Sequence, residues 1–184
     1  IHPEAAEYEE QLHIIKNLGL KGIKLHPDYQ RVYIDDERYV NCIDYAIGLG
    51  LHVLIHAGYD VGLGNPIHCL PEASKHLIHS LKNLSENSGQ LIFAHMGGYQ
   101  TWDAVEKYLV GEPVYMDTSY CLPQMKTKQF TRMIENHGYK KILFGTDSPW
   151  SDQGEAIQYI KQLELTDEIT DAIYWENASK LLKL

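Results

Sequence analysis

The sequence predicts an α/β fold in which parallel strands alternate with helices. Five short apolar runs recur along the chain, and each ends at a histidine or an aspartate: His26, His56, His95, Asp117 and Asp147. These end points are separated by 30, 39, 22 and 30 positions, about the length of one strand plus one crossover helix. Runs that are apolar nearly throughout are typical of strands buried on both faces of a parallel sheet.

The strands are predicted, in order, at 22–26 (GIKLH), 52–56 (HVLIH), 90–95 (QLIFAH), 113–118 (PVYMDT) and 141–146 (KILFGT). Helices are predicted between and after them, at 4–18, 36–48, 71–86, 101–109, 123–136, 153–164 and 167–183. The first shows the expected spacing, with apolar residues at 8, 12, 15 and 18, which forms one stripe on a helix. Gly19, Gly50, Gly89 and Gly138 each precede a strand, and we expect them to be left-handed helix C-caps.

Composition indicates a single globular domain over residues 1–184, because 44% hydrophobic residues in 184 can bury a core. No apolar stretch approaches the roughly 20 residues of a membrane span, and no signal peptide is visible, so no membrane partner is expected. The net charge of −9 argues against a nucleic-acid partner. Cys42, Cys69 and Cys121 form no CxxC pattern, which favours a reducing, cytoplasmic location.

Two architectures compete for this alternation. An open doubly wound sheet needs only a few functional strand ends, whereas a (β/α)₈ TIM barrel gathers all strand ends on one catalytic face. Five successive strands that end in polar residues favour the barrel. Because a barrel takes about 250 residues and eight strands, we expect about five of eight βα units here and a missing N-terminal part.

The segments GIKLHPDYQ, VLIHAG, LIFAHMGGY, VYMDTSY, ILFGTDSPW and ENASKLLKL resemble successive landmarks of the metal-dependent amidohydrolase superfamily. The likeness is to its amidohydrolase-2 branch, which includes aminocarboxymuconate-semialdehyde decarboxylase, and it extends over the whole chain. It implies that His56 binds a metal, that Asp147 binds the metal and handles a proton, and that His95 ligates the metal or polarises water or substrate. The sequence departs from the family because it has no His-x-His pair, and His2 is the only candidate ligand before the first predicted strand, since His13 lies in a predicted helix.

The residue types themselves suit this chemistry. Neutral imidazoles and a carboxylate favour zinc, which lowers the pKa of bound water to about 7. Asp147 is placed to accept and return a proton, and His95 to stabilise negative charge on a substrate. Asp147 could instead be a helix cap.

The remaining candidates concern the substrate. Lys24 and His26 lie on one face of their strand and are predicted to contact it. In the long loops after the second and fifth strands, Tyr59 and Trp150 are predicted to line the pocket, with His68 a further candidate. Asp117 could be either a capping residue or part of the rim of the site.

The leading hypothesis is therefore a metal-dependent enzyme that hydrolyses a C–N or C–O bond, or decarboxylates, in a small-molecule substrate. The alternatives are a TatD-like metal-dependent nuclease and a catalytically inactive binding protein on a degenerate barrel. As further partners we expect a second copy of the chain or the missing N-terminal segment.

Overall fold

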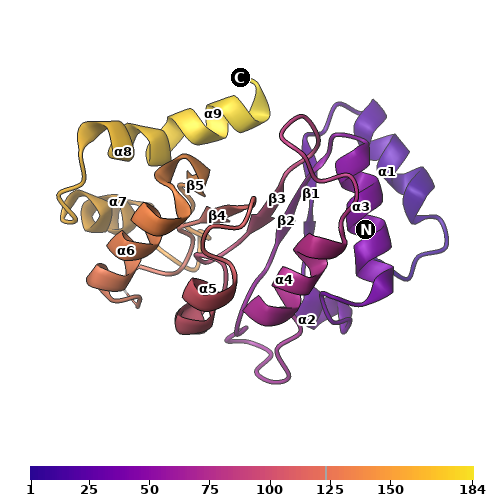
Figure 1. Ribbon diagram of the computed structural model, residues 1–184, viewed down its shortest axis with the longest axis horizontal. Coiled ribbons are helices and arrows are strands. Elements are labelled where there is room, and N and C mark those ends of the chain that lie inside the picture. The colour runs from indigo at the N-terminus through magenta and orange to yellow at the C-terminus, as the bar shows by residue number, and fades with distance from the viewer. Residues whose placement is uncertain (123) are drawn as a thin grey trace.

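The computed structural model describes residues 1–122 and 124–184 and contains one five-stranded parallel sheet (Figure 1). Its strands are β1 (Gly22–Leu25), β2 (His52–Ile55), β3 (Leu91–Phe93), β4 (Tyr115–Asp117) and β5 (Ile142–Leu143). Neighbours in the sequence are neighbours in the sheet, and every pair is parallel. The predicted parallel sheet is confirmed. Its closure into an eight-stranded barrel stays a prediction, because β1 and β5 form the edges of the described sheet.

Helices connect the strands as predicted, and their colours in Figure 1 run in chain order around the sheet. They are α1 (Tyr8–Asn17), α3 (Glu37–Gly48), α4 (Pro71–Ser80), α5 (Trp102–Tyr108), α6 (Thr127–His137) and α7 (Gln153–Lys161). The helix predicted at 167–183 is α8 (Asp167–Asp171) and α9 (Asn177–Leu182) joined by a π-helical stretch, η2 (Ala172–Glu176). The helix predicted at 123–136 begins at Thr127, and its first predicted position, Pro123, lies outside the described residues.

Two short elements were not predicted. The 3₁₀ turn η1 (Tyr139–Lys141) leads into β5, and α2 (Pro27–Gln30) begins directly after β1. Pro27 at the first helical position favours this helix start, and His26 caps it by accepting from the backbone N–H of Tyr29 at 3.4 Å.

The two faces of the sheet bury different amounts of apolar surface. Val53, Ile55 and Phe93 belong to the large core formed with the helices. On the other face a small cluster of Ile92, Leu143 and Leu181 is packed by partly buried neighbours. Leu181 belongs to α9, so the last helix covers part of the second face.

Two of the four predicted left-handed glycine caps are supported, since Gly19 and Gly50 follow helix ends with φ of 77° and 79°. Gly138 ends α6 with a positive φ of 94°, but its ψ of 114° lies outside the left-handed helical region. The prediction for Gly89 was wrong. A Cβ there would lie 2.0 Å from the carbonyl oxygen of Leu51, so Gly89 permits a close backbone approach instead. Among the described helices, none is long and apolar enough to cross a membrane.

Candidate active site

The carboxyl ends of the strands surround a cavity of about 520 Å³. Parallel strands carry their carboxyl ends to the same edge of the sheet, which is where ligands bind in such folds. All seven residues predicted for the site line this cavity: Lys24, His26, His56, Tyr59, His95, Asp147 and Trp150. The structure thus brings together residues that are up to 126 positions apart in the chain.

His56 and His95 share a hydrogen bond, and their other contacts indicate which ring nitrogen donates it. His95 Nδ1 lies 2.8 Å from the carbonyl oxygen of Ser119. Because that oxygen can only accept, Nδ1 carries the hydrogen and His95 Nε2 is an acceptor. His56 Nδ1, 3.1 Å from His95 Nε2, is then the donor, and His56 Nε2 is left with a lone pair.

That lone pair of His56 Nε2 is buried, and within the described part of the chain it has no hydrogen-bond partner. Loss of hydration, together with the neighbouring His26, His95 and Lys24, lowers the pKa of His56 to about 2. The ring therefore stays neutral at working pH. A buried polar atom without a partner is unfavourable unless a ligand satisfies it, and a neutral imidazole nitrogen is a common metal ligand.

The backbone of His95 explains how its ring reaches the cavity. Ile92 faces the small cluster and Phe93 the large core, so strict strand alternation would send His95 to the helix-covered face with Phe93. Instead, His95 and Met96 have φ of 60° and 52°, an uncommon conformation for non-glycine residues. The strand ends at this point, and the ring turns toward His56.

Asp117 holds this conformation in place. Its Oδ1 accepts from the backbone N–H of His95 at 3.0 Å and of Ser119 at 2.9 Å, and also from the Ser119 hydroxyl. From the other side, the indole of Trp102 donates to the carbonyl oxygen of His95 at 3.0 Å. Asp117 does not line the cavity, so of its two predicted roles the structure supports the structural one.

His26 lies face to face with His56, with ring centroids 4.0 Å apart and planes inclined by 8°. Because His26 Nδ1 accepts from Tyr29, its Nε2 carries the hydrogen and donates to Asp60 Oδ2 at 3.2 Å. Asp60 is oriented by its own loop, since Oδ1 accepts from the backbone N–H of Gly62 and Leu63, each at 2.8 Å. His26 is thus a hydrogen-bond donor into the cavity.

The residues fit a divalent metal at this point. Possible ligand atoms of His26, His56 and Asp60 all lie within 4.8 Å of one another, and this is the one such group found in residues 1–122 and 124–184. His56 Nε2 and the Asp60 carboxylate can bind an ion directly, whereas His26 Nε2 would first have to lose the hydrogen that it donates to Asp60. Imidazole and carboxylate donors suit zinc and related ions. Asp60 was not among the predicted site residues, although its position four residues after His56 in a glycine-rich loop was a usable signal. The metal-binding roles of His95 and Asp147 stay predictions.

Asp147 and Lys24 complete the polar lining. The helix after β5 is capped by Asp152, whose side chain accepts from Glu155 N–H at 2.9 Å, so Asp147 does not cap it. Partial loss of hydration lowers the pKa of Lys24, while the carboxylates of Asp117 and Asp147 oppose that shift. An ammonium group and a carboxylate are therefore neighbours within the cavity.

His68 does not line the cavity. Its Nδ1 and its backbone N–H both contact Asp28 Oδ1 at 2.9 Å, and this buried pair ties the end of the loop after β2 to α2. Aromatic rings form much of the remaining wall, including Tyr59, Tyr99, Tyr120 and the largely exposed Trp150.

This parallel α/β sheet, with histidines and aspartates gathered at its carboxyl edge, has the arrangement of a metal-dependent hydrolase site. The chain belongs to the amidohydrolase family, whose model, described as "Amidohydrolase" (Amidohydro_2), matches residues 2–184. No curated protein sequence matches it significantly.

Solved structures of similar fold include decarboxylases. 5-Carboxyvanillate decarboxylase from Novosphingobium aromaticivorans, with manganese and 4-hydroxy-3-methoxy-5-nitrobenzoic acid, has a TM-score of 0.73 at 16% identity and covers 100% of this chain and 63% of its own. Dihydroxybenzoic acid decarboxylase from Polaromonas, with manganese and 2-nitroresorcinol, has a TM-score of 0.67 at 19% identity. The match covers 100% of this chain and 66% of the decarboxylase. 2,6-Dihydroxybenzoate decarboxylase from Rhizobium has a TM-score of 0.66 at 18% identity, and the match covers 98% of this chain and 68% of the decarboxylase. At these identities the likeness shows the fold, and the chain spans about two thirds of the length of these proteins.

Proposed function

We propose that the chain carries the active site of a metal-dependent amidohydrolase-family enzyme that hydrolyses or decarboxylates a small carboxylated molecule. The observation that carries this proposal is the buried, unpartnered Nε2 of His56, which opens into a cavity lined by carboxylates. A divalent ion bound there supplies Lewis acidity and lowers the pKa of bound water. Zinc is the ion expected from the donor types, and manganese is the ion bound by two of the similar decarboxylases.

The polar side chains of the cavity divide the work. His56 holds the ion through Nε2, and His95 keeps His56 in the required tautomer. Asp147 accepts and returns a proton at its carboxylate, a role suited to a strand-end carboxyl group beside the reacting atoms. Asp147 is also a candidate metal ligand, and His95 is one if its Nε2 releases the hydrogen bond from His56.

Substrate contacts come from the other lining residues. Lys24 pairs with a carboxylate of the substrate, because a charge-assisted contact is strong where hydration is reduced. His26 donates from Nε2, and the rings of Tyr59 and Trp150 cover the substrate and exclude water. The ligands bound in two of the similar decarboxylases are substituted nitrophenols, so hydroxybenzoates are the first substrates to test.

No observation favours the nuclease alternative, since Lys24 is the single lysine or arginine lining this cavity in the described residues. A phosphodiester backbone is bound through several such cations. The inactive-scaffold alternative makes the opposite prediction for metal binding and is decided by the same experiment.

The test is metal content and activity of the chain after treatment with a chelator and reconstitution with Zn²⁺ or Mn²⁺. We expect tight binding of one ion per chain, and at least a ~10-fold loss of affinity in His56→Ala, the loss typical of a disturbed metal site. His79→Ala is the matched control, because His79 is exposed and lies outside the cavity. Release of carbon dioxide from hydroxybenzoates separates decarboxylation from hydrolysis. Full activity without metal, or equal metal affinity in the two variants, would contradict the proposal.

A further inference from the structure

A second and larger cavity lies at the opposite edge of the sheet, where the strands begin. It encloses about 870 Å³, within the size range of small-molecule sites. Residues at or just before the amino ends of the strands line it, among them Lys21, His52, Gln90 and Lys141. One strand, β2, runs from His52 in this cavity to the residue before His56 in the first. At about 3.3 Å per residue, those two histidines are roughly 13 Å apart, so the cavities are separate.

The charge of this cavity is opposite to that of the chain. Five of the 16 lysines and arginines line it, against one of the 25 aspartates and glutamates, Glu86. The five are Lys16, Lys21, Lys141, Lys180 and Lys183. They come from α1, the turn before β1, η1 and the end of α9. In a chain with a net charge of −9, such a concentration of one sign in a concave space attracts anions.

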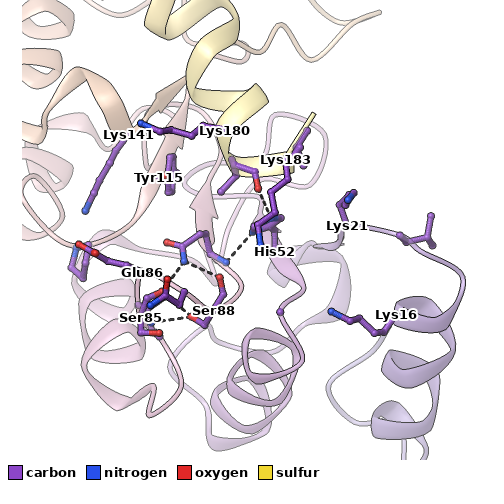
Figure 2. A pocket seen from close by; sticks show the side chains of 18 of the residues that line it. Lys16, Lys21, His52, Ser85, Glu86, Ser88, Tyr115, Lys141, Lys180 and Lys183 are labelled. Carbon is purple, nitrogen blue, oxygen red and sulfur yellow. Dashed lines mark hydrogen bonds between the residues drawn. The ribbon is translucent and has the colours of Figure 1, made fainter.

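None of these five ammonium groups forms an ion pair with a carboxylate in the described residues, in contrast to Lys75, which binds Glu112 at 2.8 Å. Figure 2 shows Lys141 and Lys180 on one side of the cavity, Lys183 beside His52, and Lys16 and Lys21 on the other side. Gly50 makes room for Lys16, because a Cβ at Gly50 would lie 3.3 Å from its Nζ. The cations therefore surround the space and are available to a ligand.

His52 holds two walls of the cavity together as a neutral residue. Its Nε2 donates to the carbonyl oxygen of Leu181 in α9 at 3.0 Å, and its Nδ1 accepts from the backbone N–H of Gln90 at 3.0 Å (Figure 2). Burial lowers the pKa of His52, with a further contribution from Lys183 and Lys21, which keeps it in this state. His52 thus links α9 to the residue before β3, and this part of the cavity wall is formed without a ligand.

The loop that contributes Gln90 is also fixed by its own hydrogen bonds. Gln90 Nε2 donates to the carbonyl oxygens of Ser85 and Ser88 at 2.8 and 3.0 Å, and the Ser88 hydroxyl accepts from Ser85 N–H at 2.9 Å. A preformed wall reduces the entropy lost when a ligand binds.

From this arrangement we propose that the cavity at the amino ends of the strands binds a small, multiply charged anion, either a polyphosphate or a polycarboxylate. A single charge would leave most of the five lysines unpaired, whereas an extended polyanion contacts cations on both sides. The concave shape and limited volume favour a small molecule over a nucleic acid or a membrane surface.

Isothermal titration calorimetry of the chelator-treated chain tests this, with tripolyphosphate, citrate and orthophosphate as probes at low ionic strength. We expect tripolyphosphate or citrate to bind once per chain with a dissociation constant below about 1 mM, and orthophosphate at least ~10-fold more weakly. Raising the salt to about 0.5 M weakens the binding at least ~10-fold, because screening is stronger. Preference for tripolyphosphate identifies a phosphate ligand, and preference for citrate a carboxylate ligand.

The double variant Lys21→Gln/Lys180→Gln removes one cation from each side of the cavity and should weaken binding at least ~10-fold. Its control, Lys128→Gln/Lys161→Gln, removes the same charge from exposed positions on α6 and α7 and should change the dissociation constant less than ~2-fold. Thermal unfolding of both variants checks that the fold is retained. If neither polyanion binds, or if both double variants weaken binding equally, the proposed site is refuted. Binding that survives Lys21→Gln/Lys180→Gln unchanged refutes it as well and points to the catalytic cavity.

Discussion

Replacing Asp117 tests whether this carboxylate maintains the turn that carries His95 into the active site. In Asp117→Ala, the backbone N–H groups of His95 and Ser119 lose the acceptor that they contact at 3.0 and 2.9 Å. A buried donor left unsatisfied is unfavourable by about 1–3 kcal/mol. Two such donors predict a decrease of about 2–6 kcal/mol in the free energy of unfolding.

Asp117→Asn keeps an amide oxygen at the same place but removes the charge. Hydrogen bonds to a neutral acceptor are roughly half as strong as those to a carboxylate, so we expect a smaller decrease, of about 1–2 kcal/mol. Urea unfolding at neutral pH gives both values, provided that the slope with denaturant is unchanged. Asp103→Ala is the control, because Asp103 is exposed and accepts one side-chain bond, from Gln129 at 2.8 Å.

If the hydrogen bonds of Asp117 act as described, the free energy of unfolding decreases from wild type to Asp117→Asn to Asp117→Ala. If the free energy of unfolding of Asp117→Ala is within about 1 kcal/mol of the wild-type value, as for an ordinary surface substitution, then the left-handed backbone of His95 is held by other contacts. Metal affinity measured on the same variants should fall in the same order, because the His95 ring fixes the tautomer of His56.

Three further predictions address the site, the backbone and the pH response. Asp147→Asn should lower kcat at least ~10²-fold with metal retained; near wild-type turnover would assign the proton transfer elsewhere. Gly58→Ala should destabilise the chain by at least ~2 kcal/mol, because φ is 86° and the new Cβ would lie 2.2 Å from the backbone nitrogen of Tyr99. The control Gly111→Ala has a similar φ of 89° but open space around it and should lose only about 1 kcal/mol; equal losses would exclude the close contact as the cause. Burial lowers the pKa of His137. Below the ordinary histidine pKa of about 6.5, the unfolded chain therefore takes up a proton that the folded chain does not, and the free energy of unfolding decreases as the pH is lowered. His137→Gln should flatten that slope in urea unfolding between pH 7 and 5, and an unchanged slope would argue against it.

Much of the fold and of the active site followed from local patterns. Apolar runs predicted the five strands because burial of a parallel strand requires apolar side chains on both faces. The same parallel arrangement explains why residues such as His56 and Asp147 line one cavity, since the carboxyl ends meet at a single edge.

Other features depend on contacts that a sequence pattern does not contain. Asp60 is positioned by backbone N–H groups of its own loop, and no periodicity marks such a turn. His95 reaches the cavity through a left-handed backbone, whereas strand alternation alone would have pointed it away. The need for glycine at position 89 arises from Leu51, 38 residues earlier in the sequence.

The topology also explains why the chain has two cavities of different character. In a sheet whose strands are all parallel, the residue after each strand belongs to one edge and the residue before it to the other. Polar residues at the strand ends, such as His56 and His95, are conspicuous in the sequence because they interrupt apolar runs. The residues before the strands, such as Lys21 and Lys141, look like ordinary solvated lysines in the sequence. Only the parallel order shows that they line the same cavity, on opposite sides of it, with helix α9 adding Lys180 from 39 residues further along. The lysines directly before β1 and β5 are therefore the sequence signal for the proposed anion site at the amino edge, which is independent of the chemistry at the carboxyl edge.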